Sequence, residues 1–221
     1  MRFDAILFDC DGVLVDSELI TNNVLREMLG AMGWQMTQEE CMAHFVGHLV
    51  QDQGELIFKK TGQQIDDAWI AGFRERRNAA LSASLTAIPH INEALIAITS
   101  SYGQKIACAS GADRGKVVLQ LTKTNLLHFF DGRIFSGVEM PKSKPAPDVY
   151  LAAAEALGVD PKRCAVIEDS PTGARAGVAA GCMVFAYCPA EGGHSNAQAM
   201  RDVGASHVFA IMTDLPALMC A

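Results

Sequence analysis

Two pairs of acidic residues follow short apolar runs, and the first pair has a spacing that suits metal-assisted chemistry. Asp9 and Asp11 come directly after the run Phe3–Phe8 and are separated by one residue. Both carboxylates would face the same side, where their repulsion favours a bound cation. Mg²⁺ takes oxygen ligands and keeps part of its shell for water or phosphate. We therefore expect Asp9 to attack phosphorus and Asp11 to transfer protons, with a simple turn as the alternative.

The second acidic pair, Glu168 and Asp169, closes the apolar run Ala165–Ile167. Ser170 and Pro171 then suit the cap and the first position of a helix. If the two apolar runs are central parallel strands, all four carboxylates converge on one site. Helix capping and compensation of the helix dipole are the alternative role for this second pair.

Two further fragments could bind a phosphate group. Ser110 and Gly111 follow the apolar run Lys105–Ala109 and offer a hydroxyl and a backbone N–H. Lys144 lies in a loop whose prolines restrict the backbone, and its cation would neutralise charge on a transferring phosphoryl group. Taken singly, the first fragment is more often a turn. The second is more often a solvated surface lysine, with Lys142 as its local competitor.

Regular elements must position these residues, and the chain alternates apolar runs with helical stretches. Such alternation predicts a mainly parallel sheet with helices on both faces and a ligand beyond the carboxyl ends of the strands. The expected strands are Phe3–Phe8, Lys105–Ala109, Arg133–Phe135, Cys164–Ile167, Cys182–Tyr187 and His207–Ala210. The expected helices are His90–Ser100, Arg114–Lys123, Asp148–Leu157, Thr172–Ala180 and Asn196–Val203.

One long segment breaks the alternation. Residues 17–85 carry helical signals only, which predicts a helical cap domain inserted into a core of residues 1–16 and 86–221. Ser17 can cap the first helix, which Gly33 ends, and Thr37 begins a capping box. Further helices are expected at Gln51–Thr61 and Asp66–Leu81.

The composition narrows the class of protein and its partners. Half of the 221 residues are hydrophobic, so we expect a packed core. The formal charge of −7 argues against a nucleic-acid binder. No apolar stretch has the length of a membrane span, and we expect no signal segment, because the strand-like run from Phe3 leaves no room for one. Seven cysteines without C-x-x-C spacing indicate neither a disulfide framework nor a zinc site, so a cytoplasmic setting is expected.

Together the four fragments resemble the haloacid dehalogenase-like hydrolase superfamily. D-x-D-G-V-L-x-D-S, a serine after the second strand, K-P-x-P-D and E-D-S-x-x-G stand in the order of its motifs I to IV. The resemblance implies a Rossmann-like α/β core with an inserted helical cap, as in β-phosphoglucomutase and the small sugar-phosphate phosphatases. It also implies Asp9 as nucleophile, Asp11 as acid and base, and Ser110 and Lys144 as phosphate ligands.

The resemblance further implies a Mg²⁺ cofactor. Its ligands would be the Asp9 carboxylate, the Asp11 backbone carbonyl and Asp169. Glu168 would support these ligands from behind or bind the ion directly. The expected activity is that of a phosphatase for a small phosphorylated metabolite, such as a sugar, sugar-acid or polyol phosphate.

Alternatives within and beyond the family remain. Asp11 favours phosphoryl transfer over dehalogenation, because a halide leaves without a proton. A β-phosphoglucomutase-like mutase is the runner-up, although Thr21 stands where such mutases carry a histidine and the loop Val46–Asp52 contains no arginine. A non-catalytic protein that binds a phosphometabolite is the third reading. The protein would be a monomer or a small homo-oligomer.

Several basic residues of the insert have no assigned role. His48 lies in a loop that commonly faces the active site in the family, yet a lone loop histidine is more often a surface residue. Arg74, Arg76 and Arg77 could reach a distal anionic group of the substrate or form a charged helix face.

Overall fold

The computed structural model describes residues 2–190 and 196–220 of the chain. The chain forms two compact units, which we call the sheet unit and the helical unit. The sheet unit comprises the chain up to Asp16 and again from Thr86 onward, and the helical unit comprises Ser17–Leu85. The insertion thus separates the first strand of the sheet from the second.

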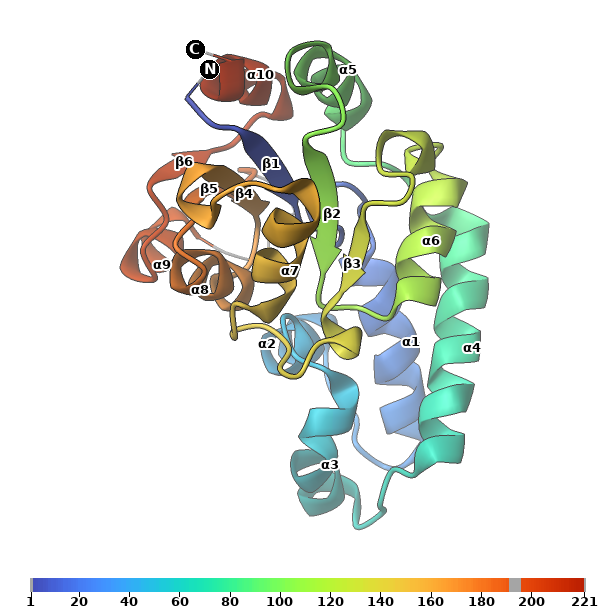
Figure 1. The fold of residues 1–221 in the computed structure, drawn as a ribbon. Helices are drawn as coiled ribbons and strands as arrows, with labels where there is room; N and C mark the ends of the chain where they lie inside the picture. The colour runs from blue at the N-terminus through green and yellow to red at the C-terminus, as the bar shows by residue number, and fades with distance from the viewer. Residues whose placement is uncertain (1, 191–195, 221) are drawn as a thin grey trace. The chain divides into compact units, whose positions relative to one another are not determined.

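A parallel sheet forms the centre of the sheet unit (Figure 1). Within the described residues it has six strands in the order β3-β2-β1-β4-β5-β6, and every neighbouring pair is parallel. The strands are β1 (Ala5–Phe8), β2 (Ile106–Ser110), β3 (Ile134–Ser136), β4 (Cys164–Glu168), β5 (Met183–Tyr187) and β6 (His207–Phe209). The run Arg133–Phe135 thus enters the sheet one residue later than expected, and the first strand begins at Ala5.

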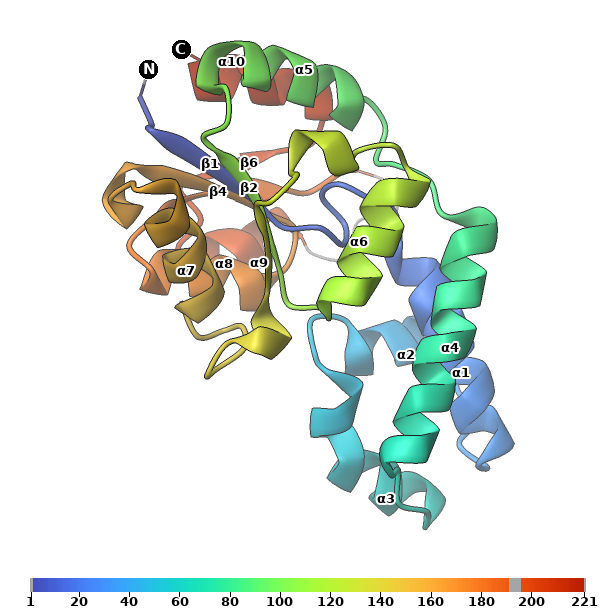
Figure 2. The same ribbon diagram turned by 45° about the vertical axis from the view of Figure 1, so that its right-hand side comes forward.

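Helices cover both faces of this sheet, as Figures 1 and 2 show. On one face lie α7 (Asp148–Leu157), α8 (Pro171–Ala179) and α9 (Ala197–Asp202). The other face carries α5 (Ile91–Tyr102), α6 (Arg114–Lys123) and α10 (Leu215–Cys220), of which α10 packs against α5. The expected fold class, a parallel α/β sheet with an inserted helical region, is confirmed. The helix at α10 was not foreseen.

The order of the strands reverses between β1 and β4, which makes this pair the topological switch point of the sheet. Both strands are completely buried, and Phe8 aligns with Cys108 on β2 and with Ile167 on β4. β4 ends one residue and β2 two residues beyond the position aligned with Phe8, so the carboxyl ends of these three strands lie close together. Residues that directly follow these strands emerge at one edge of the sheet.

The helical unit has its own hydrophobic core. Its helices are α1 (Glu18–Ala31), α2 (Gln38–Phe45), α3 (Gly54–Thr61) and α4 (Asp67–Ser84), with a 3₁₀ turn at Val50–Gln53. Side chains from all four helices and the loop after α1 form the core, namely Leu25, Met28, Leu29, Trp34, Cys41, Phe45, Ile57 and Phe73. The segment Gln51–Thr61, expected as one helix, is divided because Gln53 has a ψ of 12°, which lies outside the α-helical region.

The helix boundaries test the capping signals. Thr37 forms the expected capping box with Glu40, and Gly33 follows α1 with a φ of +96°. The expectation for Ser17 is wrong. Its backbone is helical, with φ −101° and ψ −16°, and its side chain makes no capping hydrogen bond to α1. A capping side chain reaches the helix N–H groups from an extended residue, which Ser17 is not.

The two chain segments that connect the sheet unit to the insertion run side by side. The Asp16 N–H donates to the Thr86 carbonyl at 3.0 Å, and Val15 forms an antiparallel bridge with Ala87.

Among the described helices, none combines the length and the apolar character needed to span a bilayer.

Close packing of α8 on the sheet generates a stability prediction. A Cβ atom on Gly177 would lie 2.8 Å from Val184 Cγ2 and 3.1 Å from Val166 Cγ1. We expect Gly177→Ala to lower the free energy of unfolding by about 1–3 kcal/mol, because the added methyl group overpacks the core. Denaturant unfolding followed by circular dichroism measures the change.

Gly115→Ala in α6 is the matched control. Its new methyl group would make an ordinary contact, 3.4 Å from Asp113 Oδ1. Removing a helical glycine there should raise stability by up to about 1 kcal/mol. Equal effects of the two substitutions on the free energy of unfolding would contradict the close packing of α8 against Val166 and Val184.

Candidate active site

The acidic residues that follow β1 and β4 form a buried carboxylate cluster. Asp9 directly follows β1, Glu168 closes β4, and Asp169 comes next. An oxygen of each of these carboxylates lies within 4.8 Å of the others, and all three residues are buried. The structure therefore brings together three of the four carboxylates singled out in the sequence. The side chain of Asp11 is held separately, against α6.

Lys144 joins two members of the carboxylate cluster. Its Nζ donates to Asp9 Oδ1 at 2.8 Å and to Glu168 Oε1 at 2.7 Å, and its side chain is 8% exposed. Lys142, the competing lysine of the same loop, is exposed. The proline-flanked loop thus directs one of its two lysines into the site.

Tyr150 supports this lysine and was missed in the sequence. Its hydroxyl accepts a hydrogen bond from Lys144 Nζ at 2.9 Å and donates to Glu168 Oε1 at 2.8 Å. Burial and then the Glu168 charge raise the pKa of Tyr150 well above its usual value, so the hydroxyl keeps its proton. Tyr150 lies on the buried face of α7, where an aromatic residue reads simply as core.

Glu168 is saturated with hydrogen bonds. While Oε1 binds Lys144 and Tyr150, Oε2 accepts bonds at 3.1 Å from the N–H groups of Asp169 and Ser170 and from the Ser170 hydroxyl. A carboxylate with both oxygens so engaged is a poor direct ligand for a metal ion. This favours the supporting role over the direct one. Ser170 and Pro171 also begin α8 as expected, with the Ser170 hydroxyl accepting the Gly173 N–H.

The burial of these charges changes their acidity. Burial is the main cause of the raised pKa of Asp9, which reaches about 7. The positive charge of Lys144 lowers this pKa, whereas the negative charges of Glu168 and Asp11 raise it further. Burial alone would lower the pKa of Lys144, yet the charges of Asp9 and Glu168 hold it well above its usual value. Lys144 therefore stays cationic, while Asp9 carries a carboxyl proton below about pH 7.

Two glycines allow the carboxylates to approach the backbone. A Cβ on Gly12, which has a φ of +74°, would lie 1.9 Å from Asp169 Oδ2. A Cβ on Gly173 would lie 1.6 Å from Glu168 Oε1. No larger residue fits at either position without displacing a carboxylate of the cluster. These two glycines of the first and fourth motifs are therefore required by contact with the site.

Ser110 and Gly111 lie at the carboxyl end of β2, next to β1. The Ser110 hydroxyl accepts the Ala112 N–H at 3.1 Å. A Cβ on Gly111 would lie 4.0 Å from Lys144 Cδ, so the stem of this lysine passes close to the turn. Gly137, at the start of the loop that carries Lys144, lies close to the end of β2. A Cβ added to Gly137 would lie 3.3 Å from the Ser110 carbonyl oxygen. The two fragments proposed to bind phosphate thus meet beside the carboxylate cluster.

The carboxylate of Asp11 is bound by two residues that sequence reasoning did not select. Lys116 Nζ and Gln120 Nε2 both donate to Asp11 Oδ1, at 2.8 and 2.7 Å. A signal for them was present. Lys116 and Gln120 share the buried stripe of α6 with Val117 and Leu121, where long polar side chains are rare unless they have a partner.

The carboxylate cluster fits a divalent cation. Its donors are all oxygens, the type that hard cations such as Mg²⁺ prefer. Burial raises the pKa of Asp9 in spite of Lys144, and a bound cation would favour the ionised form of this carboxylate. Asp9 and Asp169 are the side chains that would hold the ion.

The basic residues of the helical unit differ in exposure. His48, Arg76, Lys59 and Lys60 are exposed, and Arg74 donates to Gln51 Oε1 at 3.3 Å. Of the two roles left open for Arg77, the exposed charged helix face does not fit the structure. Its side chain is buried, lies over the Phe73 ring at 5.8 Å and donates to Asn78 Oδ1.

The fold and the site together define a class of protein, namely a doubly wound α/β enzyme with a carboxylate–lysine centre at its switch point. Comparison with known proteins agrees with this description. The model of the haloacid dehalogenase-like hydrolases matches residues 3–181. The chain therefore belongs to the haloacid dehalogenase-like hydrolase family, as its motifs indicate.

Two named relatives match more than four fifths of the chain, and a solved structure matches nearly all of it. A 6-phosphogluconate phosphatase of Escherichia coli (strain K12) is 30% identical over 85% of this chain and 83% of its own length. A fructose-1-phosphate phosphatase of the same organism is 28% identical, over 81% of this chain and 94% of its own. The structure of a family hydrolase from Deinococcus radiodurans R1, solved with bound phosphate and sodium, is 33% identical. It has a TM-score of 0.79 and covers 99% of this chain and 96% of that one.

The acidity of Asp9 predicts a pH-dependent affinity for divalent cations. Below about pH 7 the Asp9 carboxyl holds a proton that a cation must displace. Affinity should therefore rise with pH, by up to about tenfold per pH unit, and level off above about pH 7. Isothermal titration calorimetry with Mg²⁺ or Mn²⁺ between pH 5.5 and 8.5 measures this.

Asp9→Asn is the control for this titration. The amide has no proton to lose, so binding should be weaker and nearly constant over the same pH range. A wild-type affinity that does not change with pH would contradict the assignment of Asp9 as a ligand.

Proposed function

We propose that this protein is a Mg²⁺-dependent phosphatase that hydrolyses a small phosphorylated metabolite through an aspartyl-phosphate on Asp9. The single observation that carries the proposal is the ion pair between Lys144 and Asp9 inside the carboxylate cluster. A buried carboxylate beside an ammonium group, at the switch point of an α/β sheet, is suited to attack an anionic phosphate ester. The chain is a phosphoric monoester hydrolase, in keeping with its named relatives.

The chemistry proceeds in two steps. A carboxylate oxygen of Asp9 attacks phosphorus, the bond from phosphorus to the ester oxygen breaks, and Asp11 gives its proton to that leaving oxygen. Water then attacks the phosphorus of the aspartyl-phosphate and gives a proton to Asp11. The bond from phosphorus to Asp9 breaks, which releases inorganic phosphate and restores both groups.

Neighbouring residues orient and neutralise the reacting groups. Lys144 fixes Asp9 through Oδ1 and offers positive charge to the phosphoryl oxygens, while Ser110 and the Gly111 N–H bind these oxygens. Glu168 and Tyr150 hold the Lys144 ammonium group in place. Mg²⁺, bound by Asp9, Asp169 and the Asp11 backbone carbonyl, would reduce the repulsion between the nucleophile and the phosphate.

The substrate class proposed is a sugar, sugar-acid or polyol phosphate. Its support is the naming of relatives for 6-phosphogluconate and fructose 1-phosphate. The helical unit is proposed to act as a cap that contributes to substrate selection. A cytoplasmic setting belongs to the same proposal and is supported by the seven free cysteines, of which five are buried.

Removal of the nucleophile tests the proposal. With p-nitrophenyl phosphate and Mg²⁺, Asp9→Asn should lower kcat by at least about 10³-fold, because no carboxylate remains to accept the phosphoryl group. Chelation of Mg²⁺ by EDTA should abolish release of p-nitrophenol by the wild-type protein, and added Mg²⁺ should restore it.

Asp4→Asn is the matched control, since Asp4 lies at the opposite end of β1 in an exposed ion pair with Arg163. It should leave the rate unchanged, because exposed ion pairs contribute little to stability. Metal-independent turnover, or full activity of Asp9→Asn, would refute the proposed function.

A panel of phosphorylated metabolites tests the substrate class. We expect sugar, sugar-acid and polyol phosphates to rank above nucleotides and phosphoproteins, with free phosphate and the dephosphorylated compound as products. Phosphate assays coupled to mass spectrometry identify both. If β-glucose 1-phosphate with a bisphosphate activator gave glucose 6-phosphate faster than free phosphate, the protein would be a mutase.

A further inference from the structure

The buried face of α6 holds the carboxylate of Asp11. Lys116 and Gln120 both bind the same oxygen, Oδ1, at 2.8 and 2.7 Å. The side chains of Lys116 and Asp11 are only 8% and 15% exposed, and Gln120 is fully buried. These contacts join segments more than 100 residues apart in the sequence. A buried and charge-assisted arrangement of this kind restricts the direction of the carboxylate.

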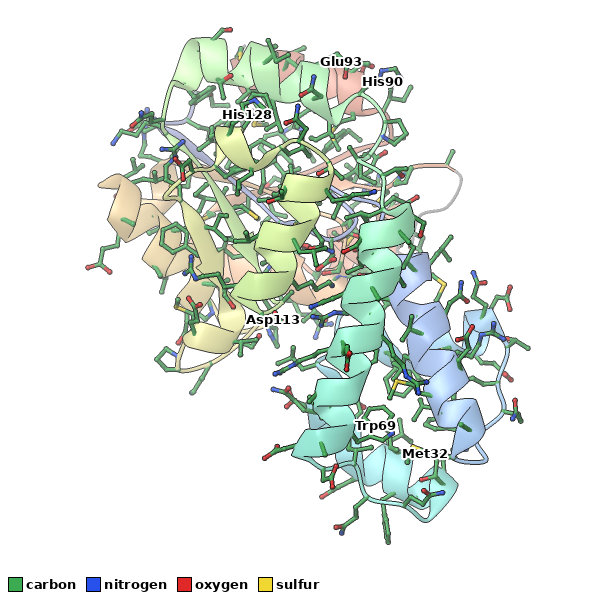
Figure 3. All side chains as sticks on the ribbon, turned by 90° about the vertical axis from the view of Figure 1, so that its right-hand side faces the viewer. Met32, Trp69, His90, Glu93, Asp113 and His128 are labelled. Carbon is green, nitrogen blue, oxygen red and sulfur yellow. The ribbon has the colours of Figure 1, made fainter. Side chains whose placement is uncertain are left out.

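Contacts other than those with Asp11 hold both donors in position. Asp113, which Figure 3 shows at the N-terminal end of α6, caps this helix by accepting the Lys116 N–H at 2.9 Å. Lys116 and Gln120 are four residues apart and therefore lie on one face of the helix. The Cys10 thiol donates to Gln120 Oε1 at 3.4 Å, which turns the amide nitrogen towards Asp11.

We propose that Lys116 and Gln120 are positioning residues for proton transfer by Asp11. Through this role they enable the site to cleave phosphate esters of alcohols whose alkoxide must be protonated as it leaves. The inference rests on the proposed function. Since Lys116 and Gln120 both hold Oδ1, they fix the direction in which the carboxyl group of Asp11 presents its proton. A general acid must lie within about 2.6–3.2 Å of the atom that it protonates. An error of about 1 Å in such a position can lower a rate by about 10²-fold.

A structural role would also account for a buried ion pair, because a buried lysine requires a counter-charge. The two roles differ in how they depend on the leaving group. An alkoxide from a sugar is strongly basic and must be protonated as its bond to phosphorus breaks. In p-nitrophenolate the nitro group delocalises the negative charge, so this group leaves without a proton. A positioning defect therefore slows the sugar phosphate selectively.

The test compares two substrates in the same protein sample. The variants are Lys116→Met and Gln120→Met, which remove each donor and keep a side chain of similar length. The substrates are p-nitrophenyl phosphate and whichever of 6-phosphogluconate, fructose 1-phosphate and glycerol 1-phosphate the wild-type protein turns over best. The quantity measured is kcat/KM, which covers steps up to phosphorylation of Asp9 and is insensitive to later hydrolysis.

We expect Lys116→Met to lower kcat/KM for the sugar or polyol phosphate by about 10²-fold, the usual contribution of a positioned acid. Gln120→Met should act in the same direction but less strongly, since it removes an uncharged donor. The value for p-nitrophenyl phosphate should change much less in both variants. Lys123→Met is the matched control, because Lys123 is exposed on the same helix, and it should change neither value.

The ratio of the two kcat/KM values separates the outcomes. An unfolded fraction lowers both values equally and leaves the ratio unchanged. Equal losses for both substrates in the two variants, including complete loss, would overturn the inference and leave a structural role. Failure of the proposed function is distinguishable, since it would appear as a wild-type protein without phosphatase activity or as an active Asp9→Asn variant.

Discussion

The burial of several like charges at one edge of the sheet is the constraint on which the rest of the structure depends. Asp9, Glu168 and Asp169 lie within a few ångströms of one another, and Lys144 binds the first two. A buried carboxylate without compensation costs several kcal/mol, so each must have a cation or several hydrogen-bond donors. Glu168 has both, because it binds Lys144, the Tyr150 hydroxyl and the N–H groups of Asp169 and Ser170. Asp9 is only partly compensated, which is reflected in its pKa of about 7.

Local backbone features follow from this constraint. Gly12 lets Asp169 lie against the loop after β1, and Gly173 lets Glu168 lie against the first turn of α8. The parallel register of β1 and β4, in which Phe8 aligns with Ile167, brings the two acidic motifs together although about 160 residues separate them. The two reacting aspartates are held by different elements. Asp9 binds Lys144 within the carboxylate cluster, whereas the side chain of Asp11 binds α6.

Much of the fold followed from the sequence because its signals are local. Apolar runs that alternate with helical stretches predict a parallel sheet, and the paired carboxylates at strand ends predict where a site lies. Tyr150, Lys116 and Gln120 could not be assigned in the same way, because their roles depend on contacts between distant segments. Ser17 shows the converse error. Its residue type suits a helix cap, but the chain enters α1 with helical dihedrals, so the side chain cannot reach the helix N–H groups.

The side-by-side course of Val15–Asp16 and Thr86–Ala87 has a consequence for how such chains diversify. The Asp16 N–H and the Thr86 carbonyl hold the two ends of the insertion together, and the entropy of closing a segment between such ends rises only slowly with its length. The helical unit also carries its own core. The sheet can therefore accept a longer, shorter or differently folded insertion at this point without losing its strand register. Selection can alter the insertion and leave the chemistry of the strand ends intact.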